Sequence, residues 1–336
     1  MDNFIIIILF ILSIGLIAIS CIFFNNAMNW LGKTFELEGT TGSVLSIIGT
    51  SLPQVIIPFI AFTFLRGGET IQIGMGAVLG APFVLSTLGF FITGYIILSL
   101  AKKGEREKEV DADFLLIARD IKFFLISYTF AIFAGFLVDK VPQVFIGLVL
   151  LIIYGYYLYR NVVYEEMVSE ELYTPLYFAP HGDFTLGNIL FQLILSLIAL
   201  IGGAGLFIHT MKEIALTGGT QSALSGLILA IIFIPLVIEI PSKLNLMERL
   251  KESKDTLAVG DITSSLIFQS CVLVTLGILF TPWKLEGISI LVGCIPIVSA
   301  TILYISLTMQ ERVNPYVLLA SGGFYLVFIL GLFFVR

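Results

Sequence analysis

A short polar run inside an apolar stretch carries the clearest chemical signal in this chain. Gly49-Thr50-Ser51-Leu52-Pro53-Gln54 lies in the middle of residues 44–65, which are otherwise mostly apolar. Hydroxyl and amide groups at mid-membrane depth are costly unless they face other protein or a hydrated cavity. Proline removes a backbone donor and clashes with the carbonyl four residues earlier, so we expect the helix to break or kink near Pro53. Broken helices of this kind expose oxygen atoms to ions in many secondary transporters.

A second set of polar residues follows in the later part of the chain. Glu239 lies in Ile234-Pro235-Leu236-Val237-Ile238-Glu239-Ile240-Pro241-Ser242, and Asp261 lies in Ala258-Val259-Gly260-Asp261-Ile262-Thr263-Ser264-Ser265. Carboxylate, hydroxyl and amide oxygens are the ligands that hard cations prefer. The candidate ion-binding residues are therefore Thr50, Ser51, Gln54, Glu239, Asp261 and Ser264, and also Ser242.

Each of the two carboxylates also has a structural interpretation. A carboxylate at the bilayer centre costs roughly 2.5–3.5 kcal/mol, which favours a partner or a proton for Glu239. Alternatively, Glu239 reaches interfacial water and pairs with Lys243, four residues on. Asp261 is either a cation ligand or the N-cap of a helix that starts near Thr263. Gln269 follows on the same span as Asp261 and could line a path, but packing or interhelical hydrogen bonding is its favoured role.

The composition excludes a soluble protein. The chain has 336 residues, of which 58% are hydrophobic and only 12% charged, and its mean hydropathy is +1.03. Apolar stretches of about 20 residues indicate membrane spans. The net charge of −6, without a basic arm, argues against nucleic-acid binding. The three cysteines and two histidines show no metal-ligand spacing, so we expect neither a resident metal nor a cofactor.

The predicted fold is an all-α polytopic membrane protein with about ten transmembrane helices. The first and second groups of five spans are separated by a polar segment, which gives a first five-helix repeat at 1–162, a linker at 163–186 and a second five-helix repeat at 187–336. The ten spans are expected at about 4–24, 43–65, 72–101, 122–139, 142–162, 187–209, 220–243, 256–281, 286–308 and 314–335.

The distribution of lysine and arginine predicts the orientation. If the N-terminus lies outside the cell, thirteen of the eighteen basic residues fall on the cytoplasmic side, as the positive-inside rule requires. We therefore expect a multi-pass protein, in the plasma membrane, with a cytoplasmic linker. The thirteen are Lys33, Lys102, Lys103, Arg106, Lys108, Arg119, Lys122, Arg160, Lys243, Arg249, Lys251, Lys254 and Arg312.

Five spans per half would place the second half in the membrane upside down relative to the first. Both halves carry a proline-containing second span and a small-residue third span, Ile73–Pro82 in the first half and Ala258–Ser265 in the second. Matching irregular segments in two inverted repeats indicate an ion site between them, with broken helices at the midplane.

At these residues the chain resembles the cation/calcium antiporter superfamily, the sodium/calcium and proton/calcium exchangers. Each repeat of that family carries a Gly-Thr-Ser-Leu-Pro-Glu helix break and then a Gly-Asn-x-x-Gly-Ser-Asn break. Gly49–Pro53 matches five consecutive positions of the first motif, and Ala258–Asp261 is similar to the second, with Asp261 in place of asparagine. The resemblance implies a secondary active cation antiporter, not an enzyme, with its ion site between the repeats.

The chain departs from this family pattern in its first repeat. Gln54 stands at the position of the family glutamate, and Ala77 or Met75 stands at the position of the asparagine. One or two carboxylates suit a monovalent ion, a proton-coupled cycle or weak calcium binding better than tight calcium binding. Calcium, sodium and protons all remain candidate cargo. A non-transporting scaffold or sensor with a degenerate ion site is the alternative function.

Overall fold

The computed structural model describes residues 3–34, 40–64, 67–163, 174–179, 185–217, 226–242 and 246–334, and every regular element within these ranges is helical. The elements are α1 (Asn3–Thr34), α2 (Thr40–Thr63), α3 (Gly68–Val84), η1 (Leu85–Gly89), α4 (Phe90–Lys102), α5 (Phe114–Ala134), α6 (Lys140–Val163), α7 (Leu186–Thr217), α8 (Gly226–Ser242), α9 (Leu246–Lys251), α10 (Asp255–Phe268), η2 (Gln269–Leu273), α11 (Val274–Phe280), α12 (Ile288–Gln310), α13 (Pro315–Ala320) and α14 (Gly322–Phe334).

The predicted all-helical, multi-pass membrane protein is confirmed. Helices suit these apolar segments because a helix satisfies its own backbone groups in lipid. Every predicted span overlaps helical structure, and two shorter apolar helices run over Ser51–Thr63 and Gly226–Glu239. In the described part of the chain, seven helices are long and apolar enough to cross a membrane: Asn3–Thr34, Gly68–Lys102, Lys140–Asn161, Leu186–Leu216, Asp255–Phe280, Ile288–Gln310 and Pro315–Leu332.

No helix break lies near Pro53 or in the proline-containing span of the second half, contrary to the prediction of broken helices there. α2 continues through both Pro53 and Pro58, and α8 is continuous from Gly226 to Ser242. A proline removes only one backbone donor, and continuing the helix keeps the other backbone groups satisfied in lipid. The helical irregularities lie in the neighbouring long helices instead, further along the chain than the predicted breaks.

Two π-helical turns, η1 and η2, interrupt these long helices. η1 joins α3 to α4, and η2 joins α10 to α11, each over five residues. A π turn frees backbone groups from the regular helical pattern and is frequent at functional sites. Near η1, the hydroxyls of Ser299 and Ser321 donate to the carbonyls of Ser86 and Thr87, at 2.6 and 2.9 Å.

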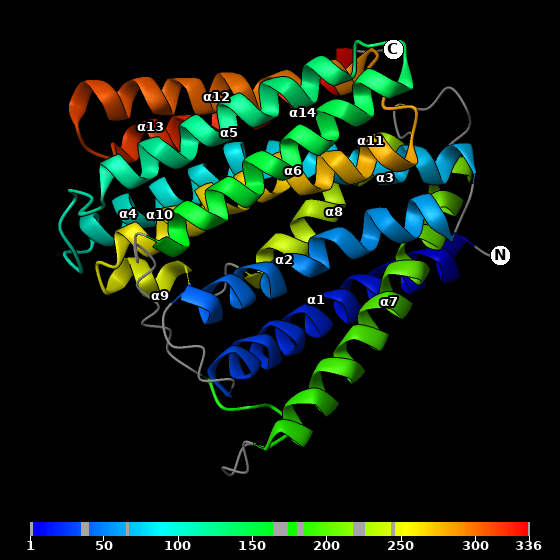
Figure 1. The fold of residues 1–336 in the computed structure, drawn as a ribbon, viewed down its shortest axis with the longest axis horizontal. Helices are drawn as coiled ribbons and strands as arrows, with labels where there is room; N and C mark the ends of the chain where they lie inside the picture. Colours follow the sequence, from blue (N-terminus) through cyan, green and yellow to red (C-terminus); the bar gives the residue numbers. More distant parts are fainter. Residues whose placement is uncertain are drawn as a thin grey trace.

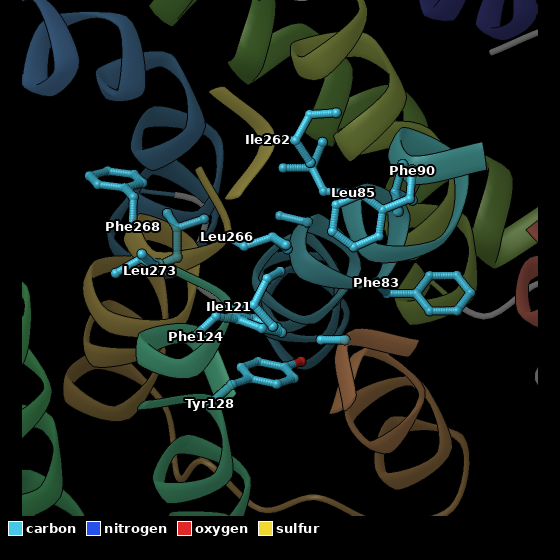
Figure 2. Packing of buried hydrophobic residues seen from close by; sticks show 14 of the residues in the cluster. Phe83, Leu85, Phe90, Ile121, Phe124, Tyr128, Ile262, Leu266, Phe268 and Leu273 are labelled. Atoms are coloured by element: carbon cyan, nitrogen blue, oxygen red, sulfur yellow. The ribbon is translucent and has the colours of Figure 1, made fainter. Parts of the chain in front are cut away.

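The helices pack around two main buried clusters, and Trp30, Leu176 and Ile189 form a small third one. α1 and α7 lie side by side along one edge, where they form an apolar cluster with α2 and α8 (Figure 1). A larger cluster lies beyond α2 and α8 and includes α4, α5, α10 and α12. Figure 2 shows its centre, where Phe90, Phe124, Tyr128, Ile262 and Leu266 converge from different helices. α2 and α8 thus lie between an edge pair and a large helical body.

An ion pair fixes the start of α10 at the end of the molecule that carries α9. Arg106, in the connection between α4 and α5, forms a two-pronged pair with Asp255, with Nη–Oδ distances of 2.8 and 2.7 Å. The guanidinium also donates to the carbonyls of Glu107, Glu109 and Leu250. All five of its N–H donors are therefore used. We call this end, where α9 and the α4–α5 connection meet, the α9 end (Figure 1).

α3 and α8 approach closely through glycines. A Cβ atom at Gly80 would lie 2.8 Å from the backbone of Ile231, and one at Gly76 would lie 2.6 Å from the carbonyl oxygen of Leu227. Small residues allow such backbone contact, which is a main source of helix association in membranes. This contact joins a helix of the first half of the chain to one of the second half.

Replacing Gly80 with alanine should therefore destabilise the protein by about 1–3 kcal/mol, because the methyl group overpacks a backbone contact that cannot yield. Gly155→Ala is the matched control, since among the described residues no atom of another helix lies within 4 Å of a Cβ there. Alanine is otherwise the better helix former, so the control should be neutral or stabilising. Thermal unfolding in detergent, followed by circular dichroism, measures both. An equal rise in melting temperature for the two variants would contradict the close approach.

Candidate ion-binding site

Three polar side chains from three helical elements meet in the interior. Gln54 lies on α2, Glu239 on α8 and Gln269 at the first position of η2. Their exposed fractions are 7%, 5% and 0%. The Gln269 Nε2 group donates to Gln54 Oε1 at 3.2 Å and to Glu239 Oε1 at 2.9 Å. One amide thus connects the motif of the first half to the carboxylate of the second half.

The amide oxygen of Gln269 is buried and receives no hydrogen bond from the residues that the structure describes. The orientation of the amide follows from its neighbours, because the Glu239 carboxylate only accepts hydrogen bonds. Both N–H groups are used by Gln54 and Glu239, which leaves Oε1 without a donor. A buried acceptor without a donor is costly, and a cation is one partner that would satisfy it.

Glu239 is the only charged member of this trio. A buried carboxylate in low dielectric needs a counter-charge, a proton or hydrogen-bond donors. Among the described residues, no group of three His, Cys, Asp or Glu side chains could hold a metal ion. The trio therefore offers one negative charge and neutral amide oxygens, which is a sparse ligand set for a divalent ion.

Ser51 lies on the same face of α2 as Gln54, three residues earlier, and is 7% exposed. Its hydroxyl is a further oxygen group, three residues before Gln54. The side chains of Thr50 and Ser242 lie outside the part of the chain whose side chains the structure describes. Lys243 also lies outside the described residues, so the predicted pairing of Glu239 with Lys243 stays a prediction.

The neighbours of η2 hold it in place through hydroxyl groups. Ser270 and Ser127 of α5 are linked by a 2.6 Å hydrogen bond between their hydroxyls. Thr275 donates to the carbonyls of Gly147 on α6 and Cys271 on η2, at 3.0 and 2.7 Å. These contacts from α5 and α6 fix the turn that presents Gln269 to the other two residues.

The small-residue segment Ile73–Pro82 of α3 contains no polar side chain that could serve as a ligand beside the trio. Ala77 is 2% exposed and belongs to the apolar cluster with α1, α7 and α8. Its neighbours Gly76 and Gly80 serve the close approach to α8. Ser86 and Thr87, further along, each donate to the carbonyl of Phe83 in their own helix. The first half therefore contributes through α2.

Asp261 and Ser264 precede Gln269 along α10. Asp261 is eight residues before Gln269, or about 12 Å along a helix. Its carboxylate lies 3.7 Å from Arg249 of α9, and its side chain is 39% exposed. Ser264 donates to the carbonyl of Asp261 at 3.3 Å. Because α10 begins at Asp255, the interpretation of Asp261 as an N-cap is wrong.

Sequence analysis did not single out Asp120, a buried carboxylate on α5. It is 2% exposed and accepts hydrogen bonds from Thr263 and Tyr157, at 3.0 and 3.3 Å. Arg119 lies 3.2 Å from its other oxygen. This network joins α5 to α6 and α10, so its carboxylate is already compensated by protein groups.

The residue that sequence reasoning underrated is Gln269. The signal that could have found it is spacing, since Asp261, Ser265 and Gln269 recur every four residues and share one face of a helix. This spacing places Gln269 in line with Asp261 and Ser265, at the buried end of the same helix face. Its favoured role from sequence, interhelical hydrogen bonding, describes its two contacts but omits its unpartnered oxygen.

Comparisons with known proteins identify the family and the fold of the chain. A family model described as sodium/calcium exchanger protein matches residues 5–163 and 188–334. The fold is similar to the crystal structure of the H+/Ca2+ exchanger CAX, with a TM-score of 0.77, 15% identity, and coverage of 98% of this chain and 82% of that one. None of the curated protein sequences matches the chain.

Two further solved structures share the fold. Native YfkE matches with a TM-score of 0.67 and 14% identity, over all of this chain and 93% of that one. The sodium-calcium exchanger NCX_Mj matches with a TM-score of 0.61 and 20% identity, over 97% and 98%. The family match covers most of the chain, in two blocks separated at the predicted linker. The chain therefore belongs to the sodium/calcium exchanger protein family, and it is a membrane cation antiporter rather than an enzyme, as its motifs predicted.

Proposed function

We propose that this antiporter binds one cation at a time between α2, α8 and η2. The observation that carries the proposal is the bridging amide of Gln269, which ties Gln54 to Glu239 and leaves its own oxygen without a donor. In the proposed site, that oxygen, the Gln54 oxygen and the Glu239 carboxylate are ligands. Ser51, and Thr50 and Ser242 from the sequence motifs, are further candidates.

The charge of the trio favours a monovalent cation. Calcium takes six to eight oxygen ligands, usually with several carboxylates. Glu239 supplies a single negative charge, and Gln54 supplies none where the family motif has glutamate. A sodium ion would be neutralised by this one carboxylate, whereas a calcium ion would leave one positive charge uncompensated inside the membrane. Sodium is therefore the proposed cargo, and weak calcium binding is the second choice.

The proposed counter-ion is the proton. A carboxylate buried in low dielectric is stable only when neutralised, either by a bound cation or by a proton. Sodium binding at Glu239 would then release one proton, and proton binding would release sodium, so the two ions exchange one for one. The empty, charged site is unfavourable, which suppresses uncoupled movement of either ion.

The proposed orientation places the α9 end in the cytoplasm of a plasma-membrane protein with its N-terminus outside. That end carries Arg106, Arg249, Lys251 and Lys254, which agrees with the positive-inside rule. The proposed organisation is two inverted five-helix repeats, 1–162 and 187–336, joined by a cytoplasmic linker. The π turns η1 and η2, each within the third predicted span of its half, support that relationship.

Proteoliposomes containing a pH-sensitive dye test the proposed exchange. An outward sodium gradient should acidify the lumen, and an equal calcium gradient should produce a much slower change. Fast calcium-driven flux with no response to sodium would overturn the assignment of a monovalent cargo. No flux with any cation, together with a melting temperature unaffected by cations, would favour a scaffold, because a ligand that binds the folded state stabilises it.

Restoring the family carboxylate supplies a sharper test. Gln54→Glu should raise the preference for calcium over sodium by about tenfold, because a second carboxylate neutralises a divalent ion. Competition between the two ions for the same dye response measures the preference. Gln54→Met is the control for size, and it should weaken transport of both ions without changing their ratio. An unchanged calcium-to-sodium preference in Gln54→Glu would show that Gln54 is not a ligand of the cation.

A further inference from the structure

One face of α10 is polar and half-exposed up to a single turn before Gln269. Gly260, Asp261, Ser264 and Ser265 are all partly exposed, whereas every residue from Leu266 through Gln269 is buried. Residues at this spacing lie on one face of a helix. We call these four residues the polar face of α10. It is continuous with the position of Gln269, one turn further on.

The opposite side of α10 is turned toward α5. Thr263 is buried there and donates to Asp120, whereas the buried side chain of Ile262 lies near Gly89 of η1. The polar face is therefore the side of α10 that remains accessible at the α9 end. Carboxylate and hydroxyl groups on a helix of this apolar chain are tolerated where they line a hydrated route rather than lipid.

Arg249 of α9 lies at the outer part of this polar face. Its Nη1 atom is 3.7 Å from Asp261 Oδ2, and the two side chains are 26% and 39% exposed. The neighbouring pair of Arg106 and Asp255 is shorter and more buried. Its Nη–Oδ distances are below 2.9 Å, and its two side chains are 2% and 0% exposed. The loose pair lacks the two-pronged geometry and burial that immobilise the tight one.

α9 itself is firmly anchored. Leu246 and Leu250 are buried, and the carbonyl of Leu250 accepts a hydrogen bond from Arg106. Arg249 therefore extends from a fixed backbone, and only its long side chain needs to move. A guanidinium held in this way can release Asp261 and return to it without rearrangement of the helices.

From these observations we propose that Arg249 is a displaceable charge gate on the route from the α9 end to Glu239. The inference rests on the proposed cation site and adds its access control. Asp261 is the carboxylate of the polar face of α10, and Arg249 is paired with it in this structure. A cation of sufficient local concentration competes with the guanidinium, passes along the polar face of α10 and reaches Gln269.

The gate predicts a one-sided change in apparent affinity. Arg249→Gln should lower the KM for sodium at the α9 end by about fivefold, because it removes a competing positive charge close to Asp261. Arg249→Lys should retain most of the wild-type KM. Lys251→Gln is the matched control on the same helix, since Lys251 faces Glu105 at 3.8 Å and should leave the KM unchanged. Right-side-out and inverted vesicles give the KM from each side.

A double variant separates the gate from a general change in surface charge. In an Asp261→Asn background, Arg249→Gln should have no further effect on the KM, because the site of competition is gone. Equal KM changes on both sides, additive effects in the double variant, or a wild-type KM in Arg249→Gln would overturn the gate while sodium-driven flux persists. Absence of flux in the wild type would instead overturn the proposed function, and the gate with it.

Discussion

Glu239→Gln should lower sodium-driven proton flux by about a hundredfold while the protein stays folded. At the proposed site, loss of the only charge in the trio leaves a bound cation uncompensated, and a charge at the bilayer centre costs roughly 2.5–3.5 kcal/mol. A cost of that size corresponds to about two powers of ten. Glutamine keeps the size of the side chain and can still accept the hydrogen bond that Gln269 donates to Oε1.

The pH dependence should change together with the rate. In the wild type, the apparent KM for sodium should rise as the pH falls, because a protonated Glu239 does not bind sodium. Glu239→Asp keeps the titratable group and should retain this dependence with a reduced rate. Proton flux in proteoliposomes at several pH values measures both. Flux near the wild-type level in Glu239→Gln, with an unchanged melting temperature, would place the ion elsewhere.

The meeting of α2 with α8 could be foreseen from the motif residues. Gly49–Pro53 and the matching order of spans predicted that Gln54 and Glu239 belong to facing parts of two halves. The hydrogen bonds through Gln269 give that expectation a concrete geometry. The all-helical membrane fold followed from hydropathy alone, because a long apolar run in lipid has few alternatives to a helix.

The rotation and regularity of α10 could not be foreseen. Periodicity shows that Asp261 and Gln269 share a face, but it does not show which of them lies at the depth of Glu239. A π turn changes the phase of the residues that follow it, and sequence gives no reliable sign of one. The proline breaks were misplaced for a related reason, since neighbouring helices decide whether a proline ends a helix or is accommodated within it.

The ion pair at the α9 end was equally hidden in the sequence. Arg106 belongs to a run of mixed charges, Lys102–Asp113, that resembles an ordinary solvated helical extension. The structure shows an irregular connection there, with Arg106 buried against Asp255, 149 residues away. Only the three-dimensional approach of the two connections separates this arginine from its exposed neighbours.

Removal of either partner of that pair should destabilise the protein more than any other single change at the α9 end. Arg106→Met or Asp255→Asn leaves a buried group without its partner, which typically costs about 3–5 kcal/mol. Asp255 also accepts the backbone N–H of Asp111 at 2.9 Å, so its loss releases the α4–α5 connection as well. Thermal unfolding in detergent should show a large drop for each single variant.

The double variant Arg106→Met/Asp255→Leu should recover much of this loss, because no charge is then left buried and unpaired. Lys251→Ala is the exposed control, since Lys251 and Glu105 are 48% and 43% exposed and such pairs contribute at most about 1 kcal/mol. Additive losses in the double variant would show that the two residues act independently.

The pair holds the start of α10, and α10 leads to Gln269, so a loosened start should also weaken sodium binding. A stable, cooperative unfolding transition combined with reduced sodium stabilisation in the double variant would separate the positioning role of the pair from its contribution to folding.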